Sequence, residues 1–440
     1  MSADTYPNRR AGWRLVALLL VAYIFSYTDR VLLSILVEPI KRDLALTDAQ
    51  IGLLLGPAFA LLYATTGVFF GALVDRRRRT WIVGAGIVFW SLATAVFGLV
   101  RQFWQLFMTR MCVGVGEASL GPAAMSLIAD SFPKESRGKP IAVYSLGIVI
   151  GSSIGFLLGA FVLDWTKTAT IPPLPIVGDL APWQLVFVIF GLAGLLPALI
   201  FFVIREPRRQ LATQSDAAGR SFITVLQFLG AHWKPYALFM TIMCLMVTLA
   251  YAGFWNPAMF ERTFGWSGEK YALINGIVSL PIGLIVYLGA GAISDRLVQA
   301  DRHDGPLLLM VLGTLIMVPL YAAAPLMPNG AVAFTVLTAG GLGVMIISAV
   351  SVTALLNIIP AHIRGQIVAL YYMVMSLFGL FVGPPAVGLL SQHVYGEANL
   401  NYALATVPVV LGVVTIVLLP LTLRHYRQQL LVVQQAAQEA

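Results

Sequence analysis

The sequence predicts an all-α membrane protein with twelve transmembrane helices, arranged as two pseudo-symmetric six-helix bundles. The first of three supporting observations is composition: 59% of the 440 residues are hydrophobic and only 11% are charged, against about 25% charged in a soluble domain. A water-soluble protein and a disordered chain are therefore excluded. At about 20 apolar residues for each spanning helix, the hydrophobic residues suffice for roughly a dozen spans.

The second observation is that windows of about 19 residues divide the chain into twelve apolar segments. Only helices and closed barrels satisfy the backbone in lipid, and runs such as LVALLLVAYIF lack the strict alternation of barrel strands. The predicted spans are 13–38, 49–74, 81–100, 103–129, 140–163, 183–204, 235–258, 270–293, 306–325, 331–358, 366–390 and 402–423.

The third observation is an internal repeat. GALVDR at Gly71–Arg76 returns as GAISDR at Gly291–Arg296, each after the second helix of its half, and PKESRG from Pro133 returns as PAHIRG from Pro360. Repeated motifs in the same order indicate a duplicated bundle. The expected parts are bundles at 1–204 and 235–423, a cytoplasmic linker at 205–234 and a cytoplasmic tail at 424–440.

The distribution of basic residues predicts that both termini are cytoplasmic. If the helices alternate in direction, 20 of the 28 lysines and arginines fall on the side of the termini and six on the opposite side. Basic loops are retained on the cytoplasmic side of membranes. Because the positive charge is spread over short loops and no basic groove with aromatic residues is present, nucleic acid is not expected as a partner.

Nothing in the sequence indicates an enzyme, a metal site or a bound cofactor. The two cysteines, Cys112 and Cys244, lie in separate apolar runs without zinc or redox spacing. A nucleotide-binding loop and a nucleophile–base pair are also missing from the sequence. We therefore expect neither enzyme activity nor a metal.

Four charged residues lie deep inside apolar segments, all in the first and fourth of them: Asp29, Arg30, Arg110 and Glu117. Each costs about 2.5–3.5 kcal/mol at a helix centre, so mutual pairing is the cheapest arrangement. Arg110 and Glu117 share one helix face, about 10 Å apart along the axis. Because adjacent residues point about 100° apart, we expect Asp29 to join Arg110, and the position of Arg30 stays open.

Glycines in three segments predict close helix packing, because a residue without a side chain lets a neighbouring helix approach. They are Gly114, Gly116 and Gly121 in the fourth segment, Gly147, Gly151 and Gly155 in the fifth, and Gly383 in the eleventh.

The loop after the second helix resembles a motif of the major facilitator superfamily of transporters. The family pattern G-x-L-x-D-R-x-G-R-[RK] is matched at Gly71, Leu73, Asp75, Arg76 and Arg79. The chain departs from it twice, because Arg78 replaces the second glycine and Thr80 the last basic residue. Twelve helices, a central linker and the half-repeat extend the resemblance over the whole chain and imply the major facilitator fold.

A closer resemblance is to the spinster-like subgroup. It is carried by YTDR at Tyr27–Arg30, RMCVGVGEAS at Arg110–Ser119 and LIADSFPKESRG, which leads into the fifth helix. An anion-symporter subgroup shares the aromatic-x-Asp-Arg pattern in its first helix, and the GEAS stretch favours spinster. The resemblance implies proton-coupled export of a lysophospholipid or sphingoid phosphate.

The intramembrane charges predict a proton-coupling network of Asp29, Glu117 and Arg110. Burial favours the protonated form of a carboxyl group and a nearby arginine favours its ionised form, so proton occupancy would change with access to water. Guanidinium groups suit phosphate, which makes Arg30 or Arg110 the expected anion ligand. The candidate substrate-binding residues are Arg30, Arg110, Tyr27, Tyr371, Tyr372, Asn357 and Trp255.

The superfamily resemblance also implies a cytoplasmic gate. Asp75 would meet the positive N-terminus of the eleventh helix after Arg364, and Asp295 that of the fifth helix near Arg137. Asp130, at the end of the fourth helix, is a possible partner of Arg79. The candidate gate residues are Asp75, Arg76, Arg79, Asp130, Arg137, Asp295, Arg296 and Arg364.

Together these features predict a secondary transporter that works by alternating access, with protons as the coupling ion and no cofactor. The first hypothesis is export of an anionic amphiphile, the second is proton symport of a small organic anion of the sugar-acid type, and the third is a non-transporting receptor. We expect a monomer in a bacterial inner membrane, with the bilayer and a small amphiphilic or anionic substrate as its partners.

Overall fold

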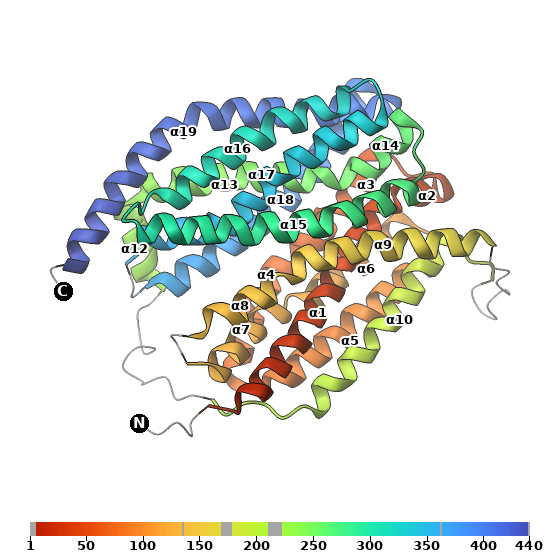
Figure 1. Ribbon diagram of the computed structural model, residues 1–440. Coiled ribbons are helices and arrows are strands. Elements are labelled where there is room, and N and C mark those ends of the chain that lie inside the picture. Colours follow the sequence, from red (N-terminus) through yellow and green to blue (C-terminus); the bar gives the residue numbers. More distant parts are fainter. Residues whose placement is uncertain (1–5, 134–135, 169–177, 210–221, 361–362, 439–440) are drawn as a thin grey trace. The chain divides into compact units, whose positions relative to one another are not determined.

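The computed structural model describes residues 6–133, 136–168, 178–209, 222–360 and 363–438 (Figure 1). Within these ranges, twelve helical spans are long and apolar enough to cross a membrane, one for each predicted segment. The predicted all-α membrane fold with twelve transmembrane helices is thereby confirmed. The chain is an integral membrane protein.

Ten helices precede the central segment: nine build the first six spans, three of which are broken, and α2 lies between the first and second spans. In chain order these helices are α1 (Arg9–Ile35), α2 (Val37–Leu44), α3 (Asp48–Leu55), α4 (Pro57–Arg76), α5 (Arg79–Phe97), α6 (Phe103–Glu117), α7 (Leu120–Ser131), α8 (Gly138–Ser145), α9 (Gly147–Thr168) and α10 (Pro182–Val203).

The remaining spans follow a short helix, α12 (Phe222–Ala231), which lies within the segment predicted as a linker. The spanning helices are α13 (Trp233–Ala252), α14 (Asn256–Phe264), α15 (Gly268–Gln299), α16 (Gly305–Ala323), α17 (Gly330–Asn357), α18 (Arg364–Leu390) and α19 (Leu400–Gln438).

Contacts between the helices group the chain into two compact units. The first holds Met1–Leu211 together with Phe254–Glu261 and Gly265–Leu280. The second holds Ala212–Gly253, Arg262–Phe264 and Pro281–Ala440. The end of the seventh span and the start of the eighth therefore pack with the first unit, and the division into bundles at 1–204 and 235–423 stays a prediction.

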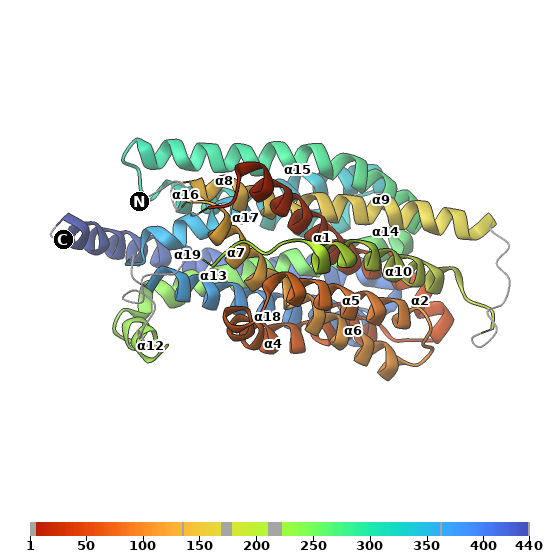
Figure 2. The ribbon, with the colours of Figure 1, turned by 90° about the horizontal axis from the view of Figure 1, so that it is seen from below.

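The same helix pairings occur inside both units. In the first unit α1 packs on α9, α5 on α6 and α5 on α10, as Figure 2 shows for α5, α6 and α10. In the second unit α13 packs on α18, α16 on α17 and α16 on α19. These are the equivalent pairs when the spans are numbered one to six in each half, so the sequence repeat is also a repeat of packing.

Glycines on α9 allow the close approach of α1. A Cβ atom added at Gly151 would lie 2.9 Å from the carbonyl oxygen of Ile24 and 2.9 Å from Cβ of Tyr27. Gly383 of α18 has the same role in the second unit, where an added Cβ would lie 2.6 Å from the carbonyl oxygen of Thr248 on α13. The expectation of close packing is confirmed at both positions.

The glycines of the fourth span differ among themselves. An added Cβ at Gly116 would lie 2.8 Å from the carbonyl oxygen of Gly86 on α5, and one at Gly114 would collide with the backbone of Phe59 on α4. Gly121 has no neighbouring atom within 4 Å of an added Cβ. The expectation of close packing at Gly121 is therefore wrong: the residue lies in α7, beyond the break after α6, and the face on which its Cβ would stand is open in the described structure.

The last helix continues well past the predicted span 402–423. α19 extends to Gln438, and its final turns pack within the second unit. The hydroxyl group of the fully buried Tyr426 donates to the carbonyl of Ala354 at 2.7 Å, and Arg427 pairs with Asp304 at 2.9 Å. The described part of the predicted tail is therefore an ordered helix with tertiary contacts.

Candidate functional site

The four intramembrane charges lie together where α1 meets α6. Asp29 and Arg30 are adjacent on α1, whereas Arg110 and Glu117 lie two turns apart on α6. All four are buried, with exposed fractions of 0%, 7%, 2% and 2% respectively. Glu117 is the last residue of α6, directly before the break that Ala118 and Ser119 make in the fourth span.

The first ion pair joins Asp29 to Arg110. Nη1 of Arg110 lies 2.5 Å from Oδ2 of Asp29. The other carboxylate oxygen of Asp29 accepts a hydrogen bond of 2.8 Å from the hydroxyl of Thr94, which lies on α5. The pairing predicted from the sequence is present, and Thr94 is a partner that the sequence analysis missed.

The second ion pair joins Arg30 to Glu117. Oε2 of Glu117 accepts hydrogen bonds from Nη2 of Arg30 at 2.7 Å, from Nε of Arg30 at 3.0 Å and from the hydroxyl of Ser26 at 2.6 Å. One carboxylate oxygen therefore takes three donors. This arrangement resolves the position of Arg30 that the sequence left open.

Three aromatic rings surround the guanidinium group of Arg30. Its Cζ atom lies 4.4 Å from the ring centre of Phe59, 5.0 Å from that of Tyr63 and 5.5 Å from that of Tyr27. Cation–π attraction of this kind contributes up to about 2 kcal/mol when the cation is desolvated. The rings of Tyr27 and of the α4 residues thus help to hold a positive charge inside the bilayer.

Two polar atoms of the cluster have no hydrogen-bond partner within the described structure: Oε1 of Glu117 and Nε of Arg110. A buried acceptor without a donor costs about 1–3 kcal/mol. Both of these atoms belong to residues of α6. On α1, both carboxylate oxygens of Asp29 accept hydrogen bonds, and Arg30 contacts Glu117 as well as the aromatic rings. The cluster is electrically neutral as a whole but has one free acceptor and one free donor.

A further buried arginine, Arg79, lies at the start of α5. It forms an ion pair with Asp130 of α7, as predicted. Its Nε also donates to Oε1 of Glu206 at 2.7 Å, and its Nη2 to the carbonyl of Pro207 at 3.1 Å. The guanidinium group, only 1% exposed, therefore ties the end of the fourth span to the segment that follows the sixth.

A model of the Major Facilitator Superfamily matches residues 19–384. The chain belongs to this superfamily.

Curated relatives agree with this assignment. The chain is 27% identical to an "MFS-type efflux pump" of Mycolicibacterium smegmatis over 89% of its own length and 86% of that protein. It is 22% identical to "Protein spinster" of Drosophila melanogaster over 89% of its length, and spans 64% of that protein. It is also 33% identical to "Protein spinster homolog 1" of Bos taurus, but over 44% of its own length and 35% of the relative.

Solved structures show the same fold. A bacterial homologue of the human lysosomal transporter spinster, in an inward-facing and unoccupied conformation, aligns with a TM-score of 0.79 at 24% identity. The alignment covers 98% of this chain and 99% of that one. The predicted resemblance to spinster-like transporters is confirmed.

The predicted substrate-binding residues of the other spans lie in different surroundings. Trp255, in the 3-10 turn between α13 and α14, is fully buried and belongs to the first unit. Tyr371 is buried and its ring meets that of Tyr372 at 5.3 Å, whereas Tyr372 is 55% exposed. The amide of Asn357 donates to the carbonyl of His303 at 3.0 Å and so holds a loop. Their roles in binding stay predictions.

The gate candidates of the half-repeat form matching local contacts. Nε of Arg137 donates to the carbonyl of Phe132 at 2.8 Å, and Nε of Arg364 to that of Ile359 at 3.2 Å. Both acceptors precede the arginine by five residues, at the end of the previous helix. Each arginine thus satisfies a carbonyl that a helix end leaves without a partner.

The acids of the repeated motif are exposed. Asp75, Arg76, Asp295 and Arg296 all lie at the surface of their units. The partners expected for the two acids belong in each case to the other unit, so both interactions stay predictions. Arg209 caps the end of α4, a role that the sequence did not indicate. Its Nη2 donates to the carbonyls of Val74 at 2.8 Å and Arg77 at 2.6 Å.

At the opposite end of α1, charged residues join α2 to α14 within the first unit. Arg42 of α2 pairs with Glu261 of α14 and lies 3.9 Å from Glu38, one turn away on its own helix. Beside them, a Cβ added at Gly268 would lie 3.3 Å from the carbonyl of Ile35. Sequence alone did not indicate this contact, because its partners are more than 200 residues apart.

Proposed function

We propose that this protein is a proton-coupled secondary transporter that works by alternating access and exports an anionic amphiphile such as a lysophospholipid or a sphingoid phosphate. The observation that carries the proposal is the neutral four-charge cluster between α1 and α6, with Oε1 of Glu117 left without a donor. Intramembrane ionisable groups mark ion and substrate pathways by default.

The geometry suggests how a proton and an anion would be coupled. When Glu117 is ionised, its charge compensates Arg30 across a distance of 2.7 Å. A proton on Oε1 would neutralise the carboxylate and leave the guanidinium group without a counter-charge. Because guanidinium binds phosphate well, the anionic head of a substrate would then replace Glu117 as the partner of Arg30.

The pair of Asp29 and Arg110 would stay intact while the substrate anion replaces Glu117 as the partner of Arg30. Asp29 holds Arg110 through one oxygen and Thr94 through the other, so its charge is fully engaged. We propose Asp29 as the second proton carrier. Asp29 would become available to a proton when Arg110 moves away from it and binds another acceptor through Nε, which has no hydrogen-bond partner in the described structure. Breaking one buried pair at a time costs less than exposing all four charges together.

Two directions of transport follow from different observations. Export is supported by the likeness to the "MFS-type efflux pump" over most of both chains. The coupling described above, in which proton and anion bind together, is compatible with both directions. Symport of a small organic anion is supported by a 29% identity to a "Probable L-galactonate transporter" of Escherichia coli over 44% of this chain.

Transport into and out of proteoliposomes under an imposed pH gradient tests the proposal. Labelled lysophospholipid and a labelled sugar acid are offered in parallel, and each should compete only with its own class. Glu117→Gln and Asp29→Asn should abolish the dependence on the pH gradient and still permit exchange of substrate. Asp301→Asn, which changes an acid in an exposed loop, is the matched control.

Dependence on the pH gradient that survives in both variants would contradict the proton assignment. Preference for the sugar acid over the lysophospholipid would favour the symport hypothesis, and binding of either without counterflow would favour the receptor. Apparent melting temperatures of all variants show that the proteins are folded.

A further inference from the structure

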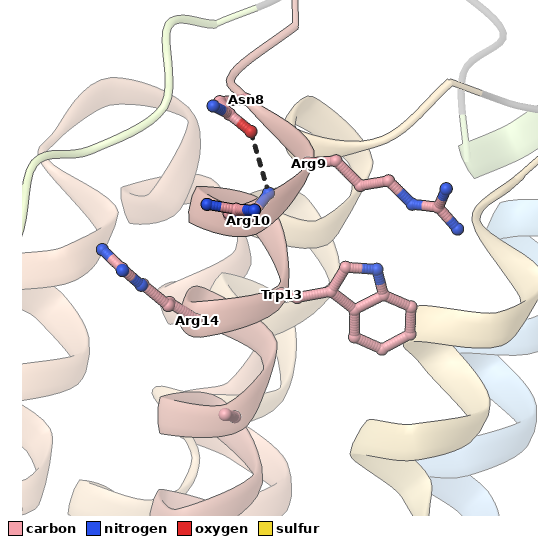
Figure 3. A pocket seen from close by; sticks show the side chains of 6 residues that line it. Asn8, Arg9, Arg10, Trp13 and Arg14 are labelled. Carbon is pink, nitrogen blue, oxygen red and sulfur yellow. Dashed lines mark hydrogen bonds between the residues drawn. The ribbon is translucent and has the colours of Figure 1, made fainter.

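The start of α1 carries three arginines around a tryptophan. A shallow pocket with a volume of about 650 Å³ lies there, and its lining residues are Asn8, Arg9, Arg10, Trp13, Arg14 and Ala17 (Figure 3). None of these residues takes part in the four-charge cluster or in the contacts of Arg79. The transport mechanism proposed above leaves this pocket without a role.

The three arginines have no acidic partner among the residues that the structure describes. Arg9, Arg10 and Arg14 are exposed, and within the described part of the chain no carboxylate pairs with any of them. The side chain of Asn8 is engaged with the backbone, since its Oδ1 accepts a hydrogen bond of 3.1 Å from the amide of Arg10. Three positive charges within two turns of helix therefore form an exposed basic cluster that would attract an anion.

Trp13 sets the depth of this cluster. Its ring meets Phe132 edge to face at 5.6 Å, which fixes it against the end of α7. Tryptophan is enriched where the hydrocarbon core meets the headgroups. The arginines lie within about one turn of Trp13, and a tryptophan at the headgroup boundary would place them at the level of the lipid phosphates.

An apolar stripe continues from the arginines into the membrane. Arg10, Arg14, Ala17 and Val21 are all exposed and follow one face of α1 at helical spacing. Figure 3 shows Arg10 and Arg14 on one side of the helix and Arg9 with Trp13 on the other. A ligand on the first side would meet two guanidinium groups and then, one turn deeper, apolar surface.

We propose that the beginning of α1 is a binding site for an anionic glycerophospholipid, with the phosphate held by Arg10 and Arg14 and an acyl chain lying along Ala17 and Val21. Residues four apart on a helix are neighbours, and two guanidinium groups can share one phosphate. Arg9 then adds attraction for a second phosphate or a neighbouring lipid. This site is independent of the transport activity proposed above.

The proposal makes two requirements of the ligand. The charge requires an anionic headgroup, and the apolar stripe requires attached acyl chains. Free glycerol phosphate satisfies the first requirement alone, and zwitterionic phosphatidylcholine satisfies the second without net negative charge. Phosphatidylglycerol satisfies both.

Lipid binding to the purified full-length protein tests this site by native mass spectrometry and by stabilisation against heat. We expect the protein to bind phosphatidylglycerol in preference to phosphatidylcholine. The triple variant Arg9→Gln, Arg10→Gln and Arg14→Gln should weaken that binding on the order of a hundredfold, because each basic residue near a membrane surface contributes about fivefold.

A matched control removes three positive charges from separate exposed positions. It combines Lys139→Gln, Arg302→Gln and Arg424→Gln, so it has the same net charge as the first variant. Unchanged affinity in this control supports a localised site. An equal loss in both triple variants would show a general charge effect and overturn the proposal, as would equal stabilisation by glycerol phosphate or by phosphatidylcholine.

Discussion

Replacing Arg110 with methionine would strand the carboxylate of Asp29 inside the protein. In the structure that carboxylate is 0% exposed and its partner guanidinium lies 2.5 Å away. Removing one member of a buried ion pair costs about 3–5 kcal/mol, because the remaining charge stays buried without compensation. The hydrogen bond from Thr94 remains, but one neutral donor replaces little of the lost charge.

Adding Asp29→Asn to Arg110→Met removes the stranded charge. An asparagine oxygen can still accept the Thr94 hydroxyl, so the double variant loses the ion pair without leaving an ion behind. Replacing both members of a buried pair is often close to neutral. We therefore expect the double variant to be more stable than Arg110→Met alone, with a coupling energy of roughly 1–3 kcal/mol.

Thermal unfolding of the purified protein in detergent measures this cycle. With about 2–4 °C for each kcal/mol in a unit of this size, Arg110→Met should lower the apparent melting temperature by roughly 6–20 °C. Thr94→Val is the control for the loss of a single hydrogen bond, with an expected cost of about 1 kcal/mol. A double variant as unstable as Arg110→Met, or an Arg110→Met protein as stable as the parent, would refute this reasoning.

Two further predictions concern helix contacts in the first unit. Gly151→Val should destabilise the protein by about 1–3 kcal/mol, because even its Cβ atom would lie 2.9 Å from the backbone of α1; Gly289→Val, at a position with no atom within 4 Å of an added Cβ, should have little effect on the melting temperature. Arg42→Glu should lower the free energy of unfolding by less than about 1 kcal/mol, because the arginine is mostly exposed, and should lower the melting temperature slightly. Adding Glu261→Arg to the same protein should restore the melting temperature. Failure of the second change to restore stability would argue against the ion pair.

Much of the fold could be predicted because it depends on the length and polarity of segments. Each apolar stretch long enough to cross a bilayer became a span. The GALVDR and GAISDR motifs lie at the C-terminal ends of α4 and α15, the second spans of the two halves, and so belong to the helices rather than to the loops expected after them. The breaks within spans were less predictable. Glu117 ends α6 in the middle of a continuous apolar segment, and nothing in the hydrophobic pattern distinguishes that residue from its neighbours in a straight helix.

The candidate site shows the same division. Charge neutrality and helix geometry predicted that Asp29 would meet Arg110, because a buried charge needs an opposite charge and few were available. The neutral partners Ser26, Thr94 and Phe59 were not predicted, since hydroxyl groups and aromatic rings occur throughout the spans. Which of them reach the charges depends on how each helix is rotated about its axis.

Contacts between distant segments also lay beyond sequence reasoning. The pairing of Arg79 with Asp130 could be predicted from the ends of adjacent spans, whereas its second acidic partner, Glu206, follows the sixth span. Residues 205–209, with the sequence REPRR, lie in the segment that was predicted to be a linker. In the structure Arg209 of that segment satisfies the last carbonyls of α4.

The sequence by itself determined the membrane fold, the number of spans, the superfamily and the presence of four buried charges, because these follow from composition, segment length and local motifs. Only the tertiary structure decided which charges pair, which oxygen of Glu117 is left without a donor in the described part of the chain, and which arginines at the start of α1 are exposed. Those features depend on distances between side chains on different helices, and such distances are set by packing.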